Sequence, residues 1–267
     1  MTTGVSGPTS QAQRDDVATV AAAGVLAATL AALCHETIGH GVGCLAVGGR
    51  ITLLTSIWFR CHGATSLTDA GGAIASVVFG ALALKIPTTL FRSQAVRLSL
   101  LVFGSVSLFW FAAQLIDHAA FNRDDWHFIA LRMHWPWEWR PLMIGLGVVA
   151  YAAIVRWTFL RLRNTAAPGA PAIRLAYLAS VGSAALAGLM WPIEPTRSAV
   201  EALLTLGVAP LGLLLAARLA QSGAEPAGTR VIARSWPLIA VSLLLFATFA
   251  LVQGRGLGPL ANTALHR

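Results

Sequence analysis

The sequence predicts an all-α multi-span membrane protein with about seven transmembrane helices and a short β-hairpin between the first and second. Two properties of the composition indicate this class: 56% of the 267 residues are hydrophobic and only 11% are charged. A third observation is the length of several apolar runs, since about 20 consecutive apolar residues are needed to cross a ~30 Å hydrocarbon layer. The 19 Lys and Arg residues outnumber the 11 Asp and Glu residues, but they stand between the apolar runs, as at membrane borders. The basic balance therefore does not indicate nucleic-acid binding.

The chain is expected to begin with a polar N-terminal tail, residues 1–16, which lacks the positively charged start of a secretory signal. An uncleaved first span follows at Val17 and carries no charge as far as Cys34. Its helix is expected to continue to about Val47, which is long enough to cross the bilayer.

A short irregular stretch follows the first span. After a pair of glycines, residues 51–59 are rich in β-branched and aromatic side chains, which predicts a short strand or hairpin with residues 60–63 as its turn. Cys44 and Cys61 flank this loop and can pair if it faces an oxidising compartment, which would leave Cys34 free.

Two further spans are expected to pack near the first. Asp69 is predicted to cap a second span that reaches about Phe91, and small residues at its start allow close approach to a neighbouring helix. A third span of uncharged residues runs from Leu98 to Ile116. Residues 17–127 are thus expected to form a core of three transmembrane helices.

The second half of the chain is expected to add a scaffold. Residues 128–140 are rich in tryptophan, which is typical of the membrane–water interface. Residues 141–254 are predicted to hold four more spans, with a kink at Pro210. Residues 255–267 are predicted to form a disordered C-terminal tail.

Residues able to carry chemistry cluster at the end of the first span, in the segment Cys34-His35-Glu36-Thr37-Ile38-Gly39-His40. Two imidazoles and a carboxylate are unfavourable in a hydrophobic helix, so a functional site is expected there. Neutral imidazoles bind Zn²⁺, and a neighbouring carboxylate can take the proton of an attacking water molecule. In the alternative interpretation, His35 and Glu36 form a buried polar pair between spans, with His40 at the membrane boundary.

The spacing of the two histidines makes a prediction about the backbone. His35 and His40 are five residues apart, whereas the usual zinc motif, His-Glu-x-x-His, places them four apart on one helix face. In a regular α-helix, five steps of about 100° leave the two side chains roughly 140° apart. A π-type turn would bring them into line, and Gly39 makes irregular backbone less unfavourable. If both histidines bind one metal ion, the helix must depart from α geometry near Ile38 and Gly39.

An acidic stretch after the third span contains the candidates for a third ligand. Counting spans places this stretch on the same side of the membrane as the histidines, so a carboxylate from it can complete a metal site. Asp124 and Asp125 are the main candidates, and Asp117 is an alternative. An acidic interfacial loop without a metal is the other interpretation.

These residues together resemble the site-2-protease family of intramembrane zinc metallopeptidases, and more closely its compact bacterial branch. The resemblance covers residues 30–127 and is carried by His35-Glu36 and Gly39-His40, Gly48-Gly49-Arg50 and the hairpin, Ala70-Gly71-Gly72, and the acidic stretch. This sequence departs from the family in two places: the histidines are spaced by five instead of four, and Asp124-Asp125-Trp126 replaces the family's Asp-Gly.

The resemblance implies a role for each matching residue. It implies His35 and His40 as zinc ligands, Glu36 as the general base, and Asp124 or Asp125 as the third ligand. It also implies a metallopeptidase-like core over residues 17–127 and hydrolysis of peptide bonds of membrane-protein or peptide substrates within or near the lipid bilayer.

Two other functions remain open at this point. A non-catalytic metal-binding or transport protein could gather a metal ion at the loop with His40, Cys44, Cys61 and His62. An inactive scaffold would bind no metal. The residues whose substitution removes the metal would distinguish these functions from a protease.

The composition also suggests a location. Lysine is nearly absent against eighteen arginines, which suggests a GC-rich bacterial gene and hence a bacterial inner membrane. With seven spans, eleven of the nineteen Lys and Arg residues fall on the side of the N-terminus. The positive-inside rule then favours a cytoplasmic N-terminus and places the histidines toward the periplasm.

Overall fold

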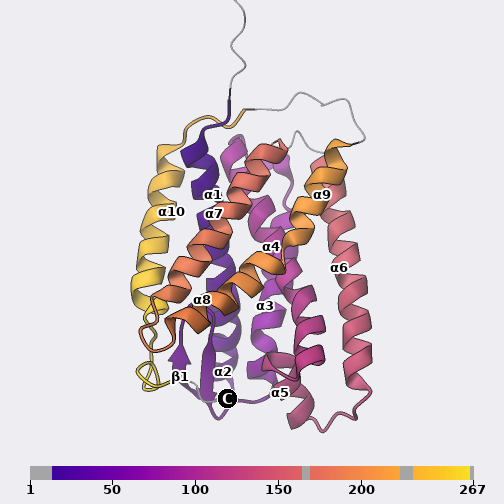
Figure 1. Ribbon diagram of the computed structural model, residues 1–267, viewed down its shortest axis with the longest axis vertical. Coiled ribbons are helices and arrows are strands. Elements are labelled where there is room, and N and C mark those ends of the chain that lie inside the picture. Colours follow the sequence, from indigo (N-terminus) through magenta and orange to yellow (C-terminus); the bar gives the residue numbers. More distant parts are fainter. Residues whose placement is uncertain (1–13, 164–168, 223–230, 265–267) are drawn as a thin grey trace, which may run out of the picture.

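The computed structural model describes residues 14–163, 169–222 and 231–264. Among these residues, seven helices are long and apolar enough to cross a membrane, and the sheet is a two-stranded hairpin. The predicted fold class is therefore confirmed (Figure 1).

In chain order the elements are α1 (Val17–Ala32), the π-helix η1 (Leu33–Gly41), α2 (Val42–Ala46), β1 (Arg50–Leu54), β2 (Phe59–His62), α3 (Ser66–Lys85), the 3₁₀-helix η2 (Thr88–Leu90), α4 (Gln94–Phe121), α5 (Asp124–Arg132), α6 (Trp139–Arg163), α7 (Ala170–Leu189), α8 (Pro195–Leu203), the π-helix η3 (Leu204–Val208), α9 (Leu211–Gln221), α10 (Trp236–Thr248) and the π-helix η4 (Phe249–Gly254).

The first span lies at the centre of the bundle. It is continuous through α1, η1 and α2, and α1 packs against α4, α7 and α10. Asp16 caps its N-terminus by accepting a hydrogen bond from the backbone N–H of Thr19 at 2.9 Å. Gly24 allows α7 to approach closely, because a Cβ there would overlap the backbone of Ala176.

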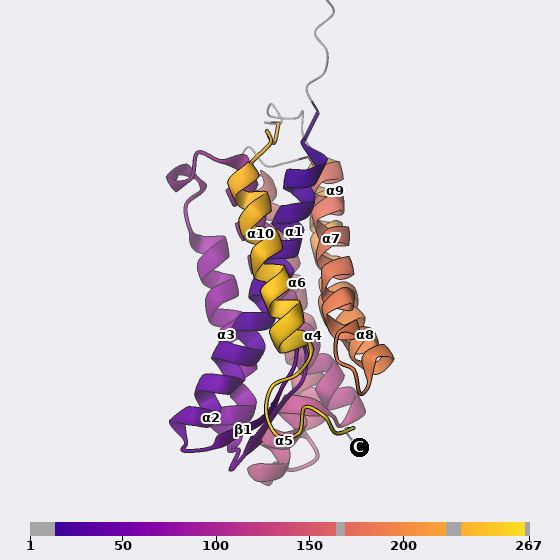
Figure 2. The same cartoon turned by 90° about the vertical axis from the view of Figure 1, so that its left-hand side faces the viewer.

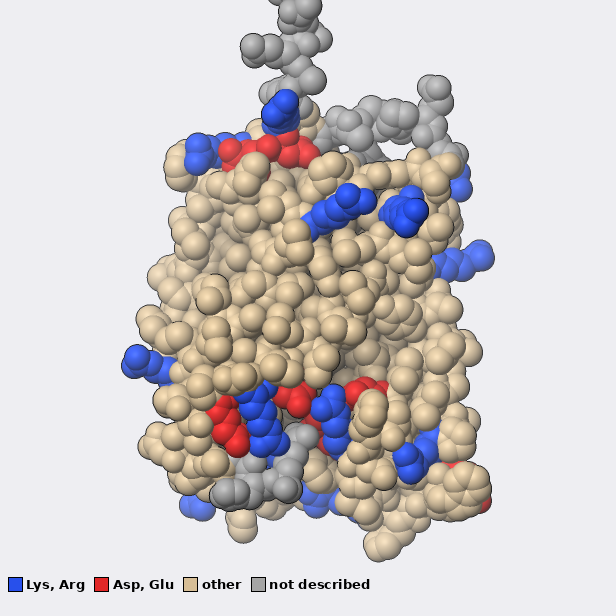
Figure 3. Space-filling model, in the orientation of Figure 1, with Lys and Arg blue, Asp and Glu red and all other residues tan. Residues whose placement is uncertain are grey.

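The hairpin and α5 lie at the end of the bundle opposite the start of α1, as Figure 2 shows. On the face drawn in Figure 3, a broad uncharged band separates charged side chains gathered toward the two ends of the molecule. This distribution matches a chain that crosses a hydrocarbon layer, because charged groups are costly at the bilayer centre.

The turn of the hairpin lies earlier than predicted. β1 pairs antiparallel with β2, so residues 60–62, predicted as the turn, belong to the second strand. The chain reverses at residues 55–58, where Thr55 Oγ1 accepts the backbone N–H of Trp58 at 2.9 Å. A threonine hydroxyl that bonds to nearby backbone stabilises a turn even within a β-branched stretch, which explains the difference.

The second span also begins earlier than predicted. Thr65 is the N-cap of α3 and forms a capping box with Thr68, so the prediction that Asp69 caps this helix is wrong. Asp69 instead lies in the first turn, and its carboxylate accepts a hydrogen bond from Arg132 of α5 at 2.7 Å.

The third and sixth spans are interrupted. α4 ends at Phe121, where Asn122 has a left-handed conformation (φ 52°), so the acidic residues after it start the separate helix α5. The sixth span consists of α8, η3 and α9 and is broken at Pro210, which confirms the predicted kink.

The prediction of a disordered C-terminal tail is wrong for residues 255–264. Leu257 exchanges two backbone hydrogen bonds with Leu54 of β1, at 2.8 and 2.9 Å, and Leu260 N–H donates to the carbonyl of Thr52 at 2.9 Å. Trp191 Nε1–H donates to the carbonyl of Ala261 at 2.9 Å. The tail is ordered because it satisfies the backbone groups at the free edge of β1. Residues 265–267 and 1–13 of the predicted tails lie outside the described residues.

Candidate metal centre

The π-helix η1 brings the two histidines of the first span together. The helix has π geometry from Leu33 to Gly41, and the Nε2 atoms of His35 and His40 lie 3.2 Å apart. A π-helix bonds residue i to residue i+5, so side chains five apart lie above one another. The predicted departure from α geometry is therefore confirmed.

Glycines of α3 make room for the π-helix and for the imidazoles. A Cβ at Gly39 would overlap the backbone of Gly71, and a Cβ at Gly71 would overlap that of Gly39. A Cβ at Gly72 would overlap Nε2 of both His35 and His40. The expected close approach of the first two spans is thus observed, and it also shapes the site.

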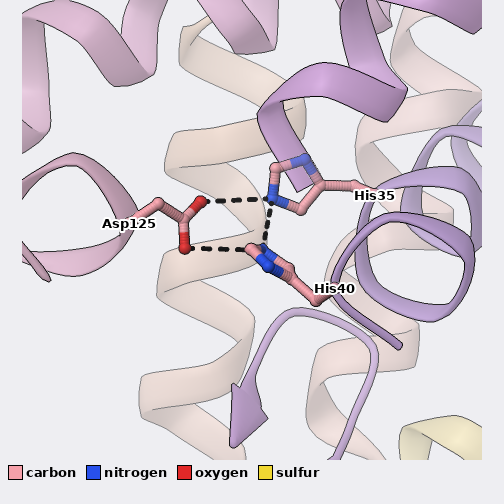
Figure 4. A group of neighbouring side chains, drawn as sticks. All are labelled: His35, His40 and Asp125. Atoms are coloured by element: carbon pink, nitrogen blue, oxygen red, sulfur yellow. Dashed lines mark hydrogen bonds and ion pairs between the residues drawn. The ribbon is translucent and has the colours of Figure 1, made fainter. Parts of the chain in front are cut away.

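Asp125, at the start of α5, completes the group (Figure 4). Its Oδ2 lies 3.6 Å from His35 Nε2, and its Oδ1 lies 3.4 Å from His40 Nε2. A tetrahedral metal with bonds of about 2.0–2.1 Å would separate its ligand atoms by ~3.3–3.4 Å. The spacing of these three donors therefore fits a group that could hold a metal ion.

Hydrogen bonds on the far side of each ring orient both imidazoles. His40 Nδ1 lies 2.8 Å from the carbonyl oxygen of Thr68, which can only accept, so Nδ1–H donates; in the neutral ring, which is the form that binds a metal, Nε2 then carries the free lone pair. His35 Nδ1 lies 3.0 Å from Ser76 Oγ, which can accept in the same way. The Nε2 lone pairs of the two neutral imidazoles and the carboxylate of Asp125 face one another, so these three groups can bind a cation together.

Aromatic stacking fixes the planes of the two rings. His35 stacks on Trp110 of α4, with ring centroids 4.0 Å apart and planes 20° apart. His40 stacks on Phe59 of β2 at 5.4 Å and 18°. Both histidines are buried, so packing from the third span and from the hairpin holds them in place.

The carboxylate of Asp125 is held in its charged form. Burial disfavours ionisation, but in the metal-free site the positive charge of a protonated His40 imidazole outweighs burial and holds the pKa of Asp125 well below its usual range. An ionised Asp125 is the form that binds a metal cation.

The other acidic candidates lie apart from this group. Asp124 lines the same cavity, but its carboxylate is not part of the three-residue group. Asp117 forms an ion pair at 2.7 Å with Arg123, which also contacts Glu201 of α8 at 3.1 Å.

Glu36 and the ligand group share a cavity of about 590 Å³. The side chain of Glu36 is only 3% exposed, so the protein interior and the cavity form its surroundings. Residues of the hairpin, α4, α5 and α8 line the rest of this cavity. It therefore offers space for a substrate beside the three donors.

Sequence reasoning assigned no role to two buried residues of α4. Gln114 Nε2 lies 3.2 Å from Asp125 Oδ2 and 3.3 Å from His35 Nε2. His118 lines the same cavity. A signal was present, because polar side chains within an apolar span are functional candidates.

Cys44 and Cys61 form a disulfide, and Cys34 is a free, buried cysteine. The disulfide joins the end of the first span to β2. A disulfide supplies no thiolate, so the suggested loop-metal site with His40, Cys44, Cys61 and His62 lacks two of its ligands.

The fold and the site define a multi-span membrane protein with a buried group of two histidines and one aspartate that could hold a metal ion. Comparison with known proteins found no match among family models, curated proteins or solved structures.

Proposed function

We propose that this protein is an integral membrane zinc metalloprotease, similar to site-2 proteases, that hydrolyses peptide bonds of membrane-protein or peptide substrates within or near the bilayer. The observation that carries the proposal is the tetrahedral spacing of donors from His35, His40 and Asp125, with Glu36 on the same cavity. Three protein ligands with a fourth position left open are typical of catalytic zinc. Magnesium and calcium prefer sites made entirely of oxygen ligands, so two imidazoles favour zinc.

Glu36 has the role of general base in this proposal. Zinc, when bound, acts as a Lewis acid and lowers the pKa of water. Glu36 accepts a proton from the attacking water, whose oxygen forms a bond to the carbonyl carbon while the carbonyl π electrons move onto the carbonyl oxygen. When that electron pair returns, the C–N bond breaks and the amine leaves with the proton that Glu36 carried. The carboxylic acid formed then gives its remaining proton to the amine, so the products are a carboxylate and a protonated amine.

The position of the site supports cleavage near the membrane surface. The hairpin and α5, which contribute to the cavity, lie at one end of the bundle, beyond the middle of the spans (Figure 2). A substrate helix cleaved there needs to unwind only near its end, which exposes fewer backbone groups to hydrocarbon than unwinding at the bilayer centre.

The disulfide supports a periplasmic location for the hairpin end of the protein. Disulfides persist in oxidising compartments such as the bacterial periplasm. Cys44 belongs to α2 and Cys61 to the hairpin, which lie at the end of the bundle opposite the start of α1, and the arginine distribution favours a cytoplasmic N-terminus. We therefore infer a bacterial inner-membrane protein whose site faces the periplasmic side. A periplasm-active reporter fused after residue 264 would be active in this orientation and inactive in the reverse one.

The test of the proposed function separates metal binding from hydrolysis. The purified wild-type chain in detergent should hold about one zinc ion and cleave unfolded model peptides or membrane-protein helices. Glu36→Gln should keep the zinc and lose cleavage, because a general base is not a ligand. Zinc binding without cleavage by the wild type would favour the non-catalytic metal-binding function, and a wild type without zinc would exclude both.

A further inference from the structure

We propose that Gln114 and His118 form a pair of N–H donors that bind the carbonyl oxygen of the substrate as it gains negative charge. This inference rests on the proposed function. The two residues are four apart on α4, so they lie on the same helix face, one turn from each other. Both line the cavity that contains the three metal-binding candidates and Glu36.

Gln114 lies directly beside the candidate ligands. Its side chain is buried, and its amide nitrogen is 3.2 Å from Asp125 Oδ2 and 3.3 Å from His35 Nε2. The first N–H of the amide is therefore held by the carboxylate. The lone pair of His35 Nε2, which accepts the second N–H, is the one that a metal ion would use. Metal binding would release this second N–H for an oxygen atom in the cavity.

His118 offers a second donor one turn away. Its Nδ1 lies 3.5 Å from the backbone N–H of Trp126, the residue after Asp125, and accepts from it. A nitrogen that accepts carries no proton, so the proton of the neutral ring is on Nε2. Within the described ranges no hydrogen bond involves this Nε2, although the side chain is only 5% exposed. A donor at a cavity wall that makes no hydrogen bond to the described protein groups is suited to a ligand oxygen.

The chemistry of peptide hydrolysis needs such donors. When water oxygen bonds to the carbonyl carbon, the π electrons move onto the carbonyl oxygen, which becomes negatively charged. Fixed N–H groups in a water-poor site stabilise this charge, and one donor is worth about 10²–10³-fold in kcat. Gln114 and His118 release no proton in this step, so Glu36 remains the group that transfers it.

The experiment uses the full zinc-loaded chain in detergent and acetohydroxamate, a small metal-binding anion whose oxygen accepts hydrogen bonds. Its affinity is measured by calorimetry at saturating zinc, and zinc content is measured in the same samples. His118→Leu and Gln114→Leu should each weaken acetohydroxamate binding by about tenfold or more, since each removes a hydrogen bond to a charged group. His118→Gln, which keeps an N–H at similar reach, should stay within about threefold of the wild type.

Gln94→Leu is the matched control, because Gln94 is the other glutamine of α4 and lies at its far end. It should leave acetohydroxamate affinity unchanged. With a peptide substrate, His118→Leu should lower kcat with little change in KM.

Four outcomes would overturn the inference. Wild-type affinity in His118→Leu and Gln114→Leu would do so while leaving the proposed function intact. Loss of zinc from His118→Leu would assign His118 to support of the metal instead. A wild type that holds zinc but not acetohydroxamate would also overturn it, whereas a wild type without zinc would overturn both proposals.

Discussion

The Nε2 atoms of His35 and His40 lie 3.2 Å apart although the two residues are five positions apart in the sequence. The π-helix that makes this possible is held against α3 by glycines that meet backbone to backbone. The unusual histidine spacing is therefore compatible with one metal ion, and the site depends on the neighbouring helix as much as on the motif.

The first prediction concerns the ligands. His35→Ala and His40→Ala should each abolish stoichiometric zinc binding by the purified chain, because each removes a donor at tetrahedral spacing. His134→Ala is the control, since His134 is exposed. Metal analysis of the detergent-solubilised chain checks this, and full zinc in both ligand variants would exclude the site.

The neighbouring aspartates provide a matched pair. Asp125→Asn should lose zinc, because the amide cannot replace an anionic ligand between the two imidazoles. Asp124→Asn should bind close to one zinc ion, and Asn tolerates the left-handed conformation at this position (φ 57°). The reverse result, with zinc lost only from Asp124→Asn, would reassign the third ligand.

A third prediction tests the space beside the imidazoles. Gly72→Ala should lower zinc occupancy and reduce the free energy of unfolding by about 1–3 kcal/mol, because its Cβ would overlap both Nε2 atoms. Gly145→Ala in α6 meets nothing within 4 Å and should not lower stability. Thermal unfolding with and without zinc measures both effects, and equal behaviour of the two variants would contradict the close packing.

The disulfide should stabilise the hairpin side of the site. Reduction, or Cys44→Ser with Cys61→Ser, should lower stability by about 3 kcal/mol by the loop-closure estimate. It should also weaken zinc binding, since Phe59 of the same strand stacks on His40. Cys34→Ser is the control because Cys34 is free. Unchanged zinc affinity after reduction would show that the hairpin keeps its position without the bond.

Acid should destabilise the metal-free chain through Asp125. Its folded-state pKa is lowered well below the usual value, so the ionised carboxylate stabilises the fold above the unfolded pKa of about 3.9, and this stabilisation is lost as the pH falls through the folded value. Asp125→Asn should remove this part of the pH dependence. Unfolding measured between about pH 5 and pH 2 compares the two chains, and parallel curves would contradict the assignment.

The sequence alone determined the membrane class, the seven spans, the kink at Pro210 and the candidate ligands His35 and His40, with Asp117, Asp124 and Asp125 as alternatives for the third ligand. These follow from local properties: apolar length, proline geometry, and polar groups that are unfavourable in hydrocarbon. Predictions from local sequence patterns were wrong where a contact with residues distant in sequence determines the structure, as in the C-terminal tail. The tail is ordered because residues around Leu257 meet the edge of β1, which no local composition signals.

Only the tertiary structure decided which groups converge at the site. Asp125 lies with the histidines, whereas Asp117 is paired with Arg123 and Asp124 is not part of the ligand group. This arrangement results from the end of α4 at Asn122 and from the packing of α5 on α3. Gln114 became part of the site only when α4 was placed beside η1. Residue types indicate which atoms can bind a metal ion, but convergence within a few ångströms depends on helix packing, and packing is a property of the whole chain.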